Sequence, residues 1–337
     1  MAAIELEGLT KDYGEVLAND DVTFDVERGE IFGYLGPNGA GKTTTIRTLL
    51  GLLSPTAGTA RLLGHDVTDE EQLLTVKRRL GYLPDSPAFD ETATGRAVLE
   101  LHASIKGDER SAELLELFDP PLDREIREYS RGNVQKLGLV TTFMHDPDLV
   151  ILDEPTSGLD PLLQQRFNEF VRAERERGLT VFFSSHILSE VRRLCDRVGI
   201  IRNGRLVAVE PVESLLDRSG KLVRLRTAEP IPPAALEIDG VHDLETAAGP
   251  NSETDDVPRG SERAFTFTGD VNVLLDRLRE SRVLDLSIEE APLEDVFMRF
   301  YGDDGGDVGS DGDDRVAAGT DASGESGSSG KGGENDV

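Results

Sequence analysis

The chain has 337 residues, of which 37% are apolar, so it is long enough for one large domain and a smaller one. Its 36 basic and 65 acidic residues give a formal charge of −29, which argues against nucleic acid as a partner because phosphate backbones attract Lys and Arg. No apolar run approaches the roughly 18 residues of a membrane span, and the opening MAAIELEG lacks a signal-peptide pattern, so we expect a cytoplasmic chain.

The acid excess predicts adaptation to concentrated salt. Only seven of the 36 basic residues are Lys, and the acidic residues are spread along the chain. Salt screens the repulsion between such charges, which would otherwise destabilise the compact state. The alternative is an acidic cytosolic protein without this adaptation, but −29 is far beyond what solubility needs.

Strands and helices alternate from the N-terminus to about residue 210. Residues 1–35 are expected to form strands with turns, and about 86–148 to be mostly helical. Further helices are expected at 42–52, about 70–79, about 161–177 and 187–195. The apolar run DLVILDEP predicts a buried parallel strand, LTVFFSS a second strand, and RVGIIRNGRLVAVE a hairpin that turns at Asn203-Gly204. The alternation predicts an α/β fold with a parallel, helix-covered sheet.

The pattern changes after residue 219, which we take as the end of the first domain. Residues 220–301 predict a small α+β domain, in which 241–262 form a long loop. Its expected strands are 221–227, 263–269 and 283–289, and its expected helices 270–280 and 292–302. Residues 302–337 carry ten acidic and two basic residues with little apolar content, which predicts a disordered acidic tail.

The stretch GPNGAGKTT fits the phosphate-loop pattern, which places glycines, a lysine and a threonine at fixed spacing between a strand and a helix. The residues expected to bind the phosphates of ATP are Gly36, Pro37, Asn38, Gly39, Ala40, Gly41, Lys42, Thr43 and Thr44. Glycines let backbone N–H groups approach phosphate oxygens, and the helix N-terminus adds favourable partial charge. Lys42 is expected to reach the β- and γ-phosphates, and the Thr43 hydroxyl to ligate Mg²⁺. The alternative is a glycine-rich turn with a chance lysine.

Two acids end the apolar run LVILDEP. Asp153 is expected to hold Mg²⁺, and Glu154 to polarise an attacking water as a general base. Alone, the pair would be interpreted as caps at a strand end. The upstream phosphate loop favours the Mg²⁺ interpretation.

In this order of motifs the chain resembles the ATP-binding cassette (ABC) transporter ATPases, over most of residues 4–215. The matching motifs are Tyr13 in KDYG, the phosphate loop 36–44, YSRGN at 129–133, ILDEP, TSGLD at 156–160, and His186 in SSHILSE. The resemblance implies a P-loop NTPase fold with a parallel-sheet core, an antiparallel β subdomain and an inserted helical subdomain at about 86–148. The segment PLEDVFMRFYG is similar to the C-terminal end of ATPases from the drug-export-like branch.

The resemblance also assigns roles to single residues. Tyr13 would stack on adenine, and His186 would hydrogen-bond the γ-phosphate and act in catalysis with Lys42 and Glu154. Other assignments involve a second copy of the chain in a head-to-tail dimer. Ser130 and Gly132 would face the ATP held by the partner, and Asp160 would cap the helix that starts at Pro161 and lie at the subunit junction.

Two motifs depart from the family pattern. YSRGN has Arg131 in place of the first glycine of the signature and Asn133 in place of its glutamine. Asp85 in GYLPD stands where the family has Gln, or Glu in the drug-export-like branch.

Phe89 and the segment FDETATGRAV are the expected contacts for a permease.

The sequence therefore predicts an ATPase subunit on the cytoplasmic face of the membrane that energises a separate transmembrane permease, in the export direction. Two alternatives remain open. One is a soluble ABC protein acting on ribosomes or chromosomes, which usually carries two cassettes or a long coiled-coil insertion. The other is a nucleotide-gated binding module with negligible hydrolysis, against which Glu154 argues.

Overall fold

The computed structural model describes residues 2–229, 231–232, 236, 239–246, 261–279 and 281–290. The predicted helix at 292–302 and the predicted tail at 302–337 lie outside these residues. Within them, no helix combines the length and the apolar character needed to cross a membrane.

A six-stranded sheet forms the centre of the cassette, in the order β10-β9-β3-β8-β7-β6. Its strands are Arg205–Pro211 (β10), Arg197–Arg202 (β9), Ile31–Leu35 (β3), Thr180–Ser185 (β8), Leu149–Asp153 (β7) and Leu80–Leu83 (β6). All neighbours run parallel except β10, which pairs antiparallel with β9 across the Asn203-Gly204 turn. The predicted parallel sheet and hairpin are therefore confirmed. β6 is an addition that the sequence analysis did not anticipate.

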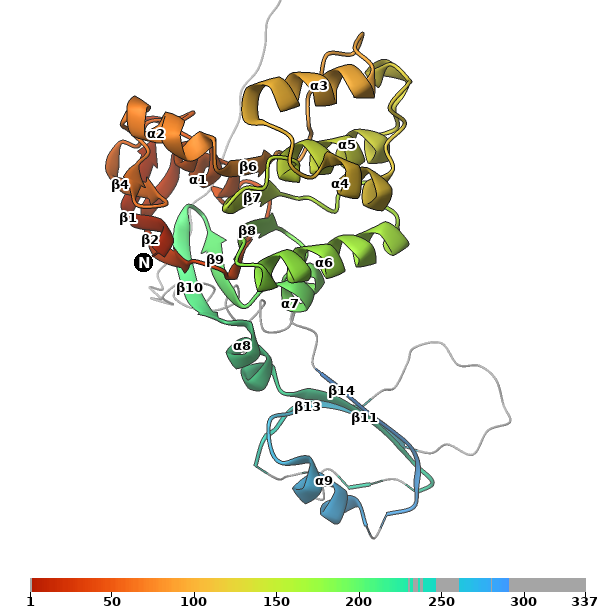
Figure 1. Cartoon of the computed structure of the whole chain (residues 1–337). Helices are drawn as coiled ribbons and strands as arrows, with labels where there is room; N and C mark the ends of the chain where they lie inside the picture. The colour runs from red at the N-terminus through yellow and green to blue at the C-terminus, as the bar shows by residue number, and fades with distance from the viewer. Residues whose placement is uncertain are drawn as a thin grey trace, which may run out of the picture. The chain divides into compact units, whose positions relative to one another are not determined.

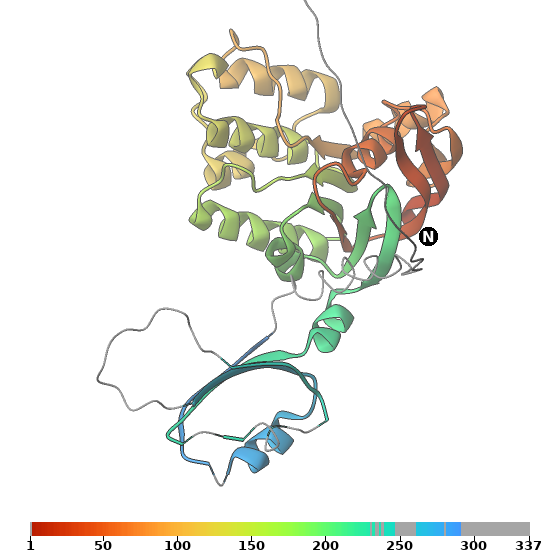
Figure 2. The ribbon, with the colours of Figure 1, turned by 180° about the vertical axis from the view of Figure 1, so that it is seen from behind.

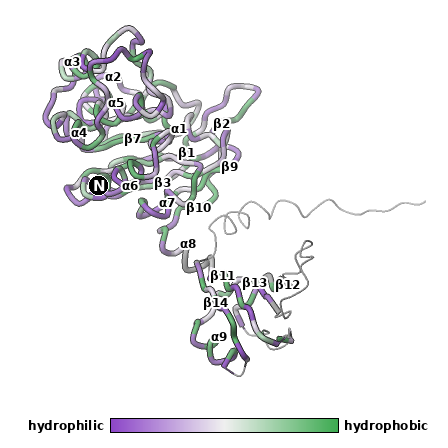
Figure 3. Tube along the Cα trace, turned by 90° about the vertical axis from the view of Figure 1, so that its right-hand side faces the viewer, coloured by the Kyte–Doolittle hydropathy of each residue, from purple (hydrophilic) through white to green (hydrophobic). Residues whose placement is uncertain are grey.

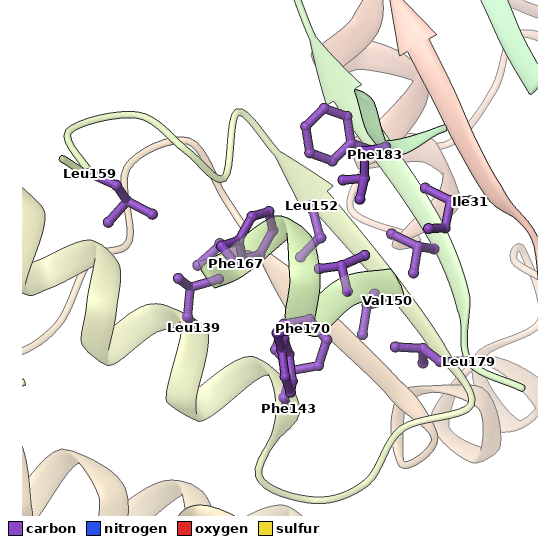
Figure 4. Close-up of a cluster of buried hydrophobic side chains, with 14 of the residues drawn as sticks. Ile31, Leu139, Phe143, Val150, Leu152, Leu159, Phe167, Phe170, Leu179 and Phe183 are labelled. Carbon is purple, nitrogen blue, oxygen red and sulfur yellow. The ribbon is translucent and has the colours of Figure 1, made fainter. Parts of the chain in front are cut away.

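The strands β3, β7 and β8 are buried on both faces of this sheet, which explains their apolar runs. Strand β7 is hydrophobic in Figure 3 up to its last residue, Asp153. On β7, Val150 and Leu152 belong to one core, with the helices α5 (Arg131–Phe143), α6 (Pro161–Glu176) and α7 (Leu188–Leu194). Figure 4 shows this core, where Phe143, Phe167 and Phe170 pack against the strands.

The other face, with Leu149 and Ile151, packs against α1 (Lys42–Leu49) and a second, antiparallel sheet. That sheet has the order β2-β1-β4-β5. Its strands are Leu17–Glu27 (β2), Ala2–Asp12 (β1), Ala57–Leu62 (β4) and His65–Asp66 (β5), and α2 (Glu70–Lys77) follows. Phe24 of β2 stacks on Phe32 of β3, with ring centroids 5.2 Å apart, so aromatic packing joins the two sheets.

The helical subdomain lies beside β6 and β7, as Figures 1 and 2 show from opposite sides. It contains α3 (Gly95–Lys106), α4 (Ser111–Phe118), the short helix Ile126–Glu128 and α5. The predicted mostly helical stretch at 86–148 is thus confirmed. A buried ion pair connects it to the core, because both terminal nitrogens of Arg110 donate to Glu174 of α6, at 2.5 and 2.7 Å.

The C-terminal region contains a four-stranded antiparallel sheet with the order β12-β13-β11-β14. Its elements are β11 (Lys221–Thr227), β12 (Val241–Thr246), β13 (Ser261–Phe267), α9 (Val271–Leu278) and β14 (Val283–Glu290). The helix before it, α8 (Val212–Ser219), packs on the core of the cassette through Val212 and Leu215. Leu274 and Leu278 of α9 pack on Phe265 and Phe267 of β13. The predicted loop at 241–262 is wrong at both ends, since 241–246 pair with β13 and Ser261 belongs to β13 itself. This polar edge strand gains its order from backbone pairing and from two apolar contacts, Val241 and Leu244.

Candidate functional site

The loop between β3 and α1 takes the conformation that its glycines allow. A side chain at Gly36 would place its Cβ 2.4 Å from the carbonyl oxygen of Ile201. Gly41 has a φ of 109°, and a Cβ there would lie 2.4 Å from the carbonyl oxygen of Ala18. Both positions therefore require glycine, because the backbones of β2 and β9 approach the loop too closely for any side chain.

A buried network holds this loop from behind. Asn19 is fully buried, and its side-chain amide donates to Thr45 Oγ1 at 3.0 Å. Tyr34 shares the same hydroxyl at 3.1 Å. The hairpin turn supports the loop from the side, where the backbone N–H of Gly204 donates to the carbonyl of Ala40 at 3.0 Å. These bonds hold the loop from two sides.

Lys42 is the first residue of α1 and is only 6% exposed. Its Nζ donates to the carbonyl of Gly36 at 2.5 Å and to that of Pro37 at 3.3 Å, so the ammonium folds back over the loop. Burial lowers the pKa of Lys42, and the nearby Glu154, 3.9 Å away, partly opposes that shift. A buried cation of this kind gains most from a polyanionic ligand.

The two acids lie at the end of β7. Asp153 is 6% exposed, and burial raises its pKa. Glu154 adopts a φ of 50°, a conformation that is costly for a residue other than glycine and is concentrated at functional sites. His186 follows β8, and its Nδ1 lies 2.8 Å from Glu154 Oε1. The structure therefore brings the three predicted catalytic residues, Lys42, Glu154 and His186, together.

Lys42, Asp153 and Glu154 border a cavity of about 460 Å³, whereas His186 lines a neighbouring one. The lining of the first cavity comprises Val16, Leu17, Ala18, Pro37, Asn38, Gly39, Gly41, Lys42, Thr43, Thr44, Asp85, Asp153, Glu154, Asn203 and Gly204. The sequence analysis missed the contributions of 16–18 and 203–204. The Asn203-Gly204 turn was visible in the sequence, but only the pairing of β9 with β3 brings it beside the phosphate loop.

The donor set of the cavity fits Mg²⁺ with a phosphate ligand. The Thr43 hydroxyl and the Asp153 carboxylate both line it, and these are hard oxygen ligands. Over the described ranges no three His, Cys, Asp or Glu side chains gather as a metal cage. An ion here would therefore take its remaining ligands from phosphate and water, as Mg²⁺ commonly does.

Tyr13 lies outside the residues that line this cavity. Its side chain is 53% exposed, and the Lys11 ammonium lies 5.1 Å from its ring centroid. The backbone turn at 13–16 nevertheless places Val16 and Leu17 in the lining. Stacking of Tyr13 on adenine stays a prediction.

The YSRGN segment contributes no residue to the described lining of the cavity beside the phosphate loop. Ser130 caps α5, where its Oγ accepts from the backbone N–H of Asn133 at 3.3 Å. A Cβ at Gly132 would lie 2.7 Å from the carbonyl oxygen of Gly158, so this loop packs closely on the TSGLD loop. Among the described residues that line the phosphate cavity, neither Ser130 nor Gly132 appears.

Asp160 ends the TSGLD loop and caps α6 as predicted, since its Oδ1 accepts from the backbone N–H of Leu163 at 2.9 Å. Asp85 follows β6 and lines the phosphate cavity. It also lines a neighbouring cavity of about 460 Å³, together with Arg131, Ser157 and His186. The two cavities share Asn38, Asp85 and Glu154 and so meet at these three residues.

Known proteins resemble this chain over nearly its whole length. A family model described as ABC transporter matches residues 19–157. The bacitracin transport ATP-binding protein BcrA of Bacillus licheniformis is 34% identical over 316 residues, which cover 91% of this chain and 99% of that protein. The Nod factor export ATP-binding protein I of Mesorhizobium japonicum is 34% identical over 310 residues, or 89% of this chain and 87% of its own.

A solved structure agrees with these matches. The ATP-binding subunit of an ABC transporter superposes with a TM-score of 0.59 at 33% identity. The superposition covers 64% of this chain and 92% of that one.

Proposed function

The chain belongs to the ABC transporter family and is a transport-coupled ATPase subunit, and we propose that two copies of it enclose MgATP and drive a separate membrane permease that works as an exporter. The observation that carries this proposal is the convergence of Lys42 and His186 on Glu154, where two adjoining cavities meet. Glu154 Oε1 lies 3.9 Å from Lys42 Nζ, beside the phosphate loop, and 2.8 Å from His186 Nδ1.

Each part of the cavity has its own role. The backbone N–H groups at the start of α1 and the Lys42 ammonium bind the phosphates. Thr43 and Asp153 would hold Mg²⁺, which supplies positive charge to the phosphate oxygens. Glu154 takes a proton from the attacking water. The imidazole of His186, whose Nδ1 lies 2.8 Å from Glu154 Oε1, orients the Glu154 carboxylate.

The TSGLD and YSRGN loops support the dimeric arrangement. Within one chain, Ser130 and the N-terminus of α5 stand apart from the phosphate cavity, so they complete no site there. A helix N-terminus with a serine cap favours an anion. In a head-to-tail dimer the same group would close the cavity of the partner.

Names of relatives support the transport direction. One relative is a Nod factor export protein and another a bacitracin transport protein, and this chain spans 99% of the latter. A full-length match to transport subunits favours a transporter over a ribosome- or chromosome-associated ATPase. We place the subunit on the cytoplasmic face of the membrane, bound to its permease near Phe89. The charge of −29 supports work in concentrated salt.

Glu154→Gln tests the role of the base. The amide keeps the size of the side chain but takes up no proton from water, so ATP hydrolysis should fall by about two to four powers of ten. ATP binding should persist, and an ATP-bound dimer should accumulate in size-exclusion chromatography. Near-normal phosphate release would place the base elsewhere, with Asp85 the next residue to test.

A further inference from the structure

The carboxylate of Glu190 on α7 joins two loops that the ATPase site uses. Ser185 Oγ donates to Glu190 Oε2 at 2.8 Å, and Thr156 Oγ1 donates to Glu190 Oε1. Ser185 Oγ also accepts from the backbone N–H of Ile187 at 2.9 Å. Thr156 is 4% exposed and Ser185 is 0% exposed, so water does not compete effectively for these bonds.

The bridge that Glu190 forms between Thr156 and Ser185 lies just beyond the point where the pairing of β7 with β8 ends. β7 and β8 pair up to Asp153 and Ser184, and the backbone N–H of Glu154 still donates to the carbonyl of Ser184 at 3.0 Å. Beyond that bond the two segments of the chain separate. The segment after β7 enters the loop that starts at Thr156, and the segment after β8 continues to His186. Glu190 reconnects them with one side chain.

Glu154 and His186 lie directly beside the bridged residues. Thr156 is two positions after Glu154, and Ser185 is one position before His186. The contact between the base and the histidine, 2.8 Å, therefore depends on the spacing of the two loops. A carboxylate is suited to this task because each of its oxygens accepts a strong charge-assisted bond from a hydroxyl.

We propose that Glu190 is a positioning residue for ATP hydrolysis, which fixes the distance between Glu154 and His186 by bonding Thr156 and Ser185. The proposal rests on the roles given above to Glu154 and His186. Glu190 lines the cavity next to these two residues but does not take part in the proton transfer. Its removal lowers the rate of the chemical step and leaves the phosphate loop, which binds ATP, unchanged.

Glu190→Ala should lower kcat about ten- to a hundredfold, because a displacement on the order of 1 Å at reacting groups has effects of that size. The KM for ATP should stay within about twofold, since no contact to the phosphate loop is lost. Thr156→Val removes only one hydroxyl at nearly constant shape and should lower kcat about tenfold. Thr156→Ser restores the hydroxyl and should recover most of the activity.

Glu169→Ala is the matched control. Glu169 lies on α6, is exposed, and accepts from Gln165 Nε2 at 2.9 Å within its own helix. The same loss of a carboxylate there should leave kcat and KM unchanged. Adding Thr156→Val to Glu190→Ala should cause no further loss, because both changes remove the same bond.

Two results would overturn the proposal. One is wild-type kcat in Glu190→Ala, and the other is a loss in Thr156→Val that Thr156→Ser does not recover. If Glu190→Ala does not fold, the two Thr156 variants decide alone. Glu154→Gln, measured in parallel, separates the failures. An inactive Glu154→Gln beside a fully active Glu190→Ala rejects only the positioning role, whereas an active Glu154→Gln rejects the assigned base.

Discussion

Arg131 and Asp85, which depart from the family pattern at the signature and after β6, pair with each other. Arg131 Nη2 lies 3.4 Å from Asp85 Oδ1 and donates to Ser157 Oγ at 2.6 Å. One guanidinium thus joins the loop after β6, the start of α5 and the loop after β7. Both side chains are about half exposed or more, so the pair contributes about 0.2–1 kcal/mol to the free energy of unfolding. Its importance lies in where the charges stand.

Arg131→Ala should raise the KM for ATP about three- to tenfold at low salt. The unpaired Asp85 carboxylate would then border the cavity that binds the phosphates, and repulsion on the order of 1 kcal/mol corresponds to about fivefold in affinity. Asp85→Asn in the same chain should recover the KM, because it removes that charge. Steady-state phosphate release at several ATP concentrations measures both effects.

Arg96→Ala is the control for this prediction. Arg96 Nη2 lies 2.7 Å from Asp123 Oδ1 on an exposed surface away from the lining of both cavities. Its loss should not change the KM. A KM that stays raised in the double variant would mean that Arg131 acts through Ser157 and not through Asp85.

His145 makes the stability of the helical subdomain depend on pH. It is 7% exposed, its Nε2 lies 3.2 Å from the carbonyl oxygen of Leu80, and its Nδ1 has no partner among the described residues. Burial, with help from the charge of Lys106, lowers the pKa of His145 to about 4. Two further charged groups have smaller effects on the pKa of His145: His102 lowers it and Asp146 raises it.

The unfolded chain takes up this proton near pH 6.5 and the folded chain only near pH 4. The contribution of His145 is therefore fully present above pH 6.5 and is lost as the pH falls, by about 2 kcal/mol at pH 5. His145→Gln keeps a donor for Leu80 but does not titrate, so its melting temperature should fall less between pH 7 and 5. His65→Gln, in β5, should follow the wild type. Parallel curves for all three proteins would contradict the prediction.

The sequence predicted well which residues lie close together at the site, because each motif is contiguous. The order of phosphate loop, acidic pair and histidine fixed which residues converge, and Asp160 before Pro161 marked the start of α6. Contacts that form only when distant segments pack together were not predicted from the sequence. Glu190 lies within the quoted SSHILSE, but its bridge to Thr156 forms only once α7 packs beside the ends of β7 and β8.

The fold was predicted less evenly. Strands with long apolar runs, such as β7, were located correctly, since burial on both faces leaves a clear pattern. The strands β4, β5 and β6 have between two and six residues, too few to show a period. β12 has a polar sequence that resembles a loop, and only its pairing with β13 makes it a strand.

Low ionic strength should destabilise the protein. The formal charge of −29 repels itself, and the screening length grows from about 3 Å at 1 M salt to about 30 Å at 0.01 M. The melting temperature should therefore fall as NaCl is removed. Deleting 302–337 removes a net charge of −8 and leaves −21, so it should lessen the effect only in part. A melting temperature that is flat or rises on desalting would reject salt adaptation.

Ser130 should act on the ATP of the partner subunit, which mixed dimers can test. Lys42→Ala removes the ammonium at the phosphate cavity, and Ser130→Ala removes the hydroxyl at the start of α5. Each change alone should abolish ATP-dependent dimerisation, because both sites of the dimer lose one component. A heterodimer of the two variants has one site with both defects and one intact site. It should therefore enclose about one ATP per dimer, measured with labelled nucleotide after gel filtration.

Thr94→Ala separates this role from helix capping. Thr94 caps α3, where its Oγ1 accepts from the backbone N–H of Ala97 at 3.2 Å, as Ser130 does on α5. Losing either cap should cost about 1 kcal/mol of folding free energy. Only the Ser130 variant should also lose dimerisation with ATP, because only the Ser130 hydroxyl is proposed to face the partner. If Ser130→Ala dimerises as well as Thr94→Ala, or if the mixed dimer encloses no ATP, then Ser130 is a cap alone and each cavity is completed by other residues.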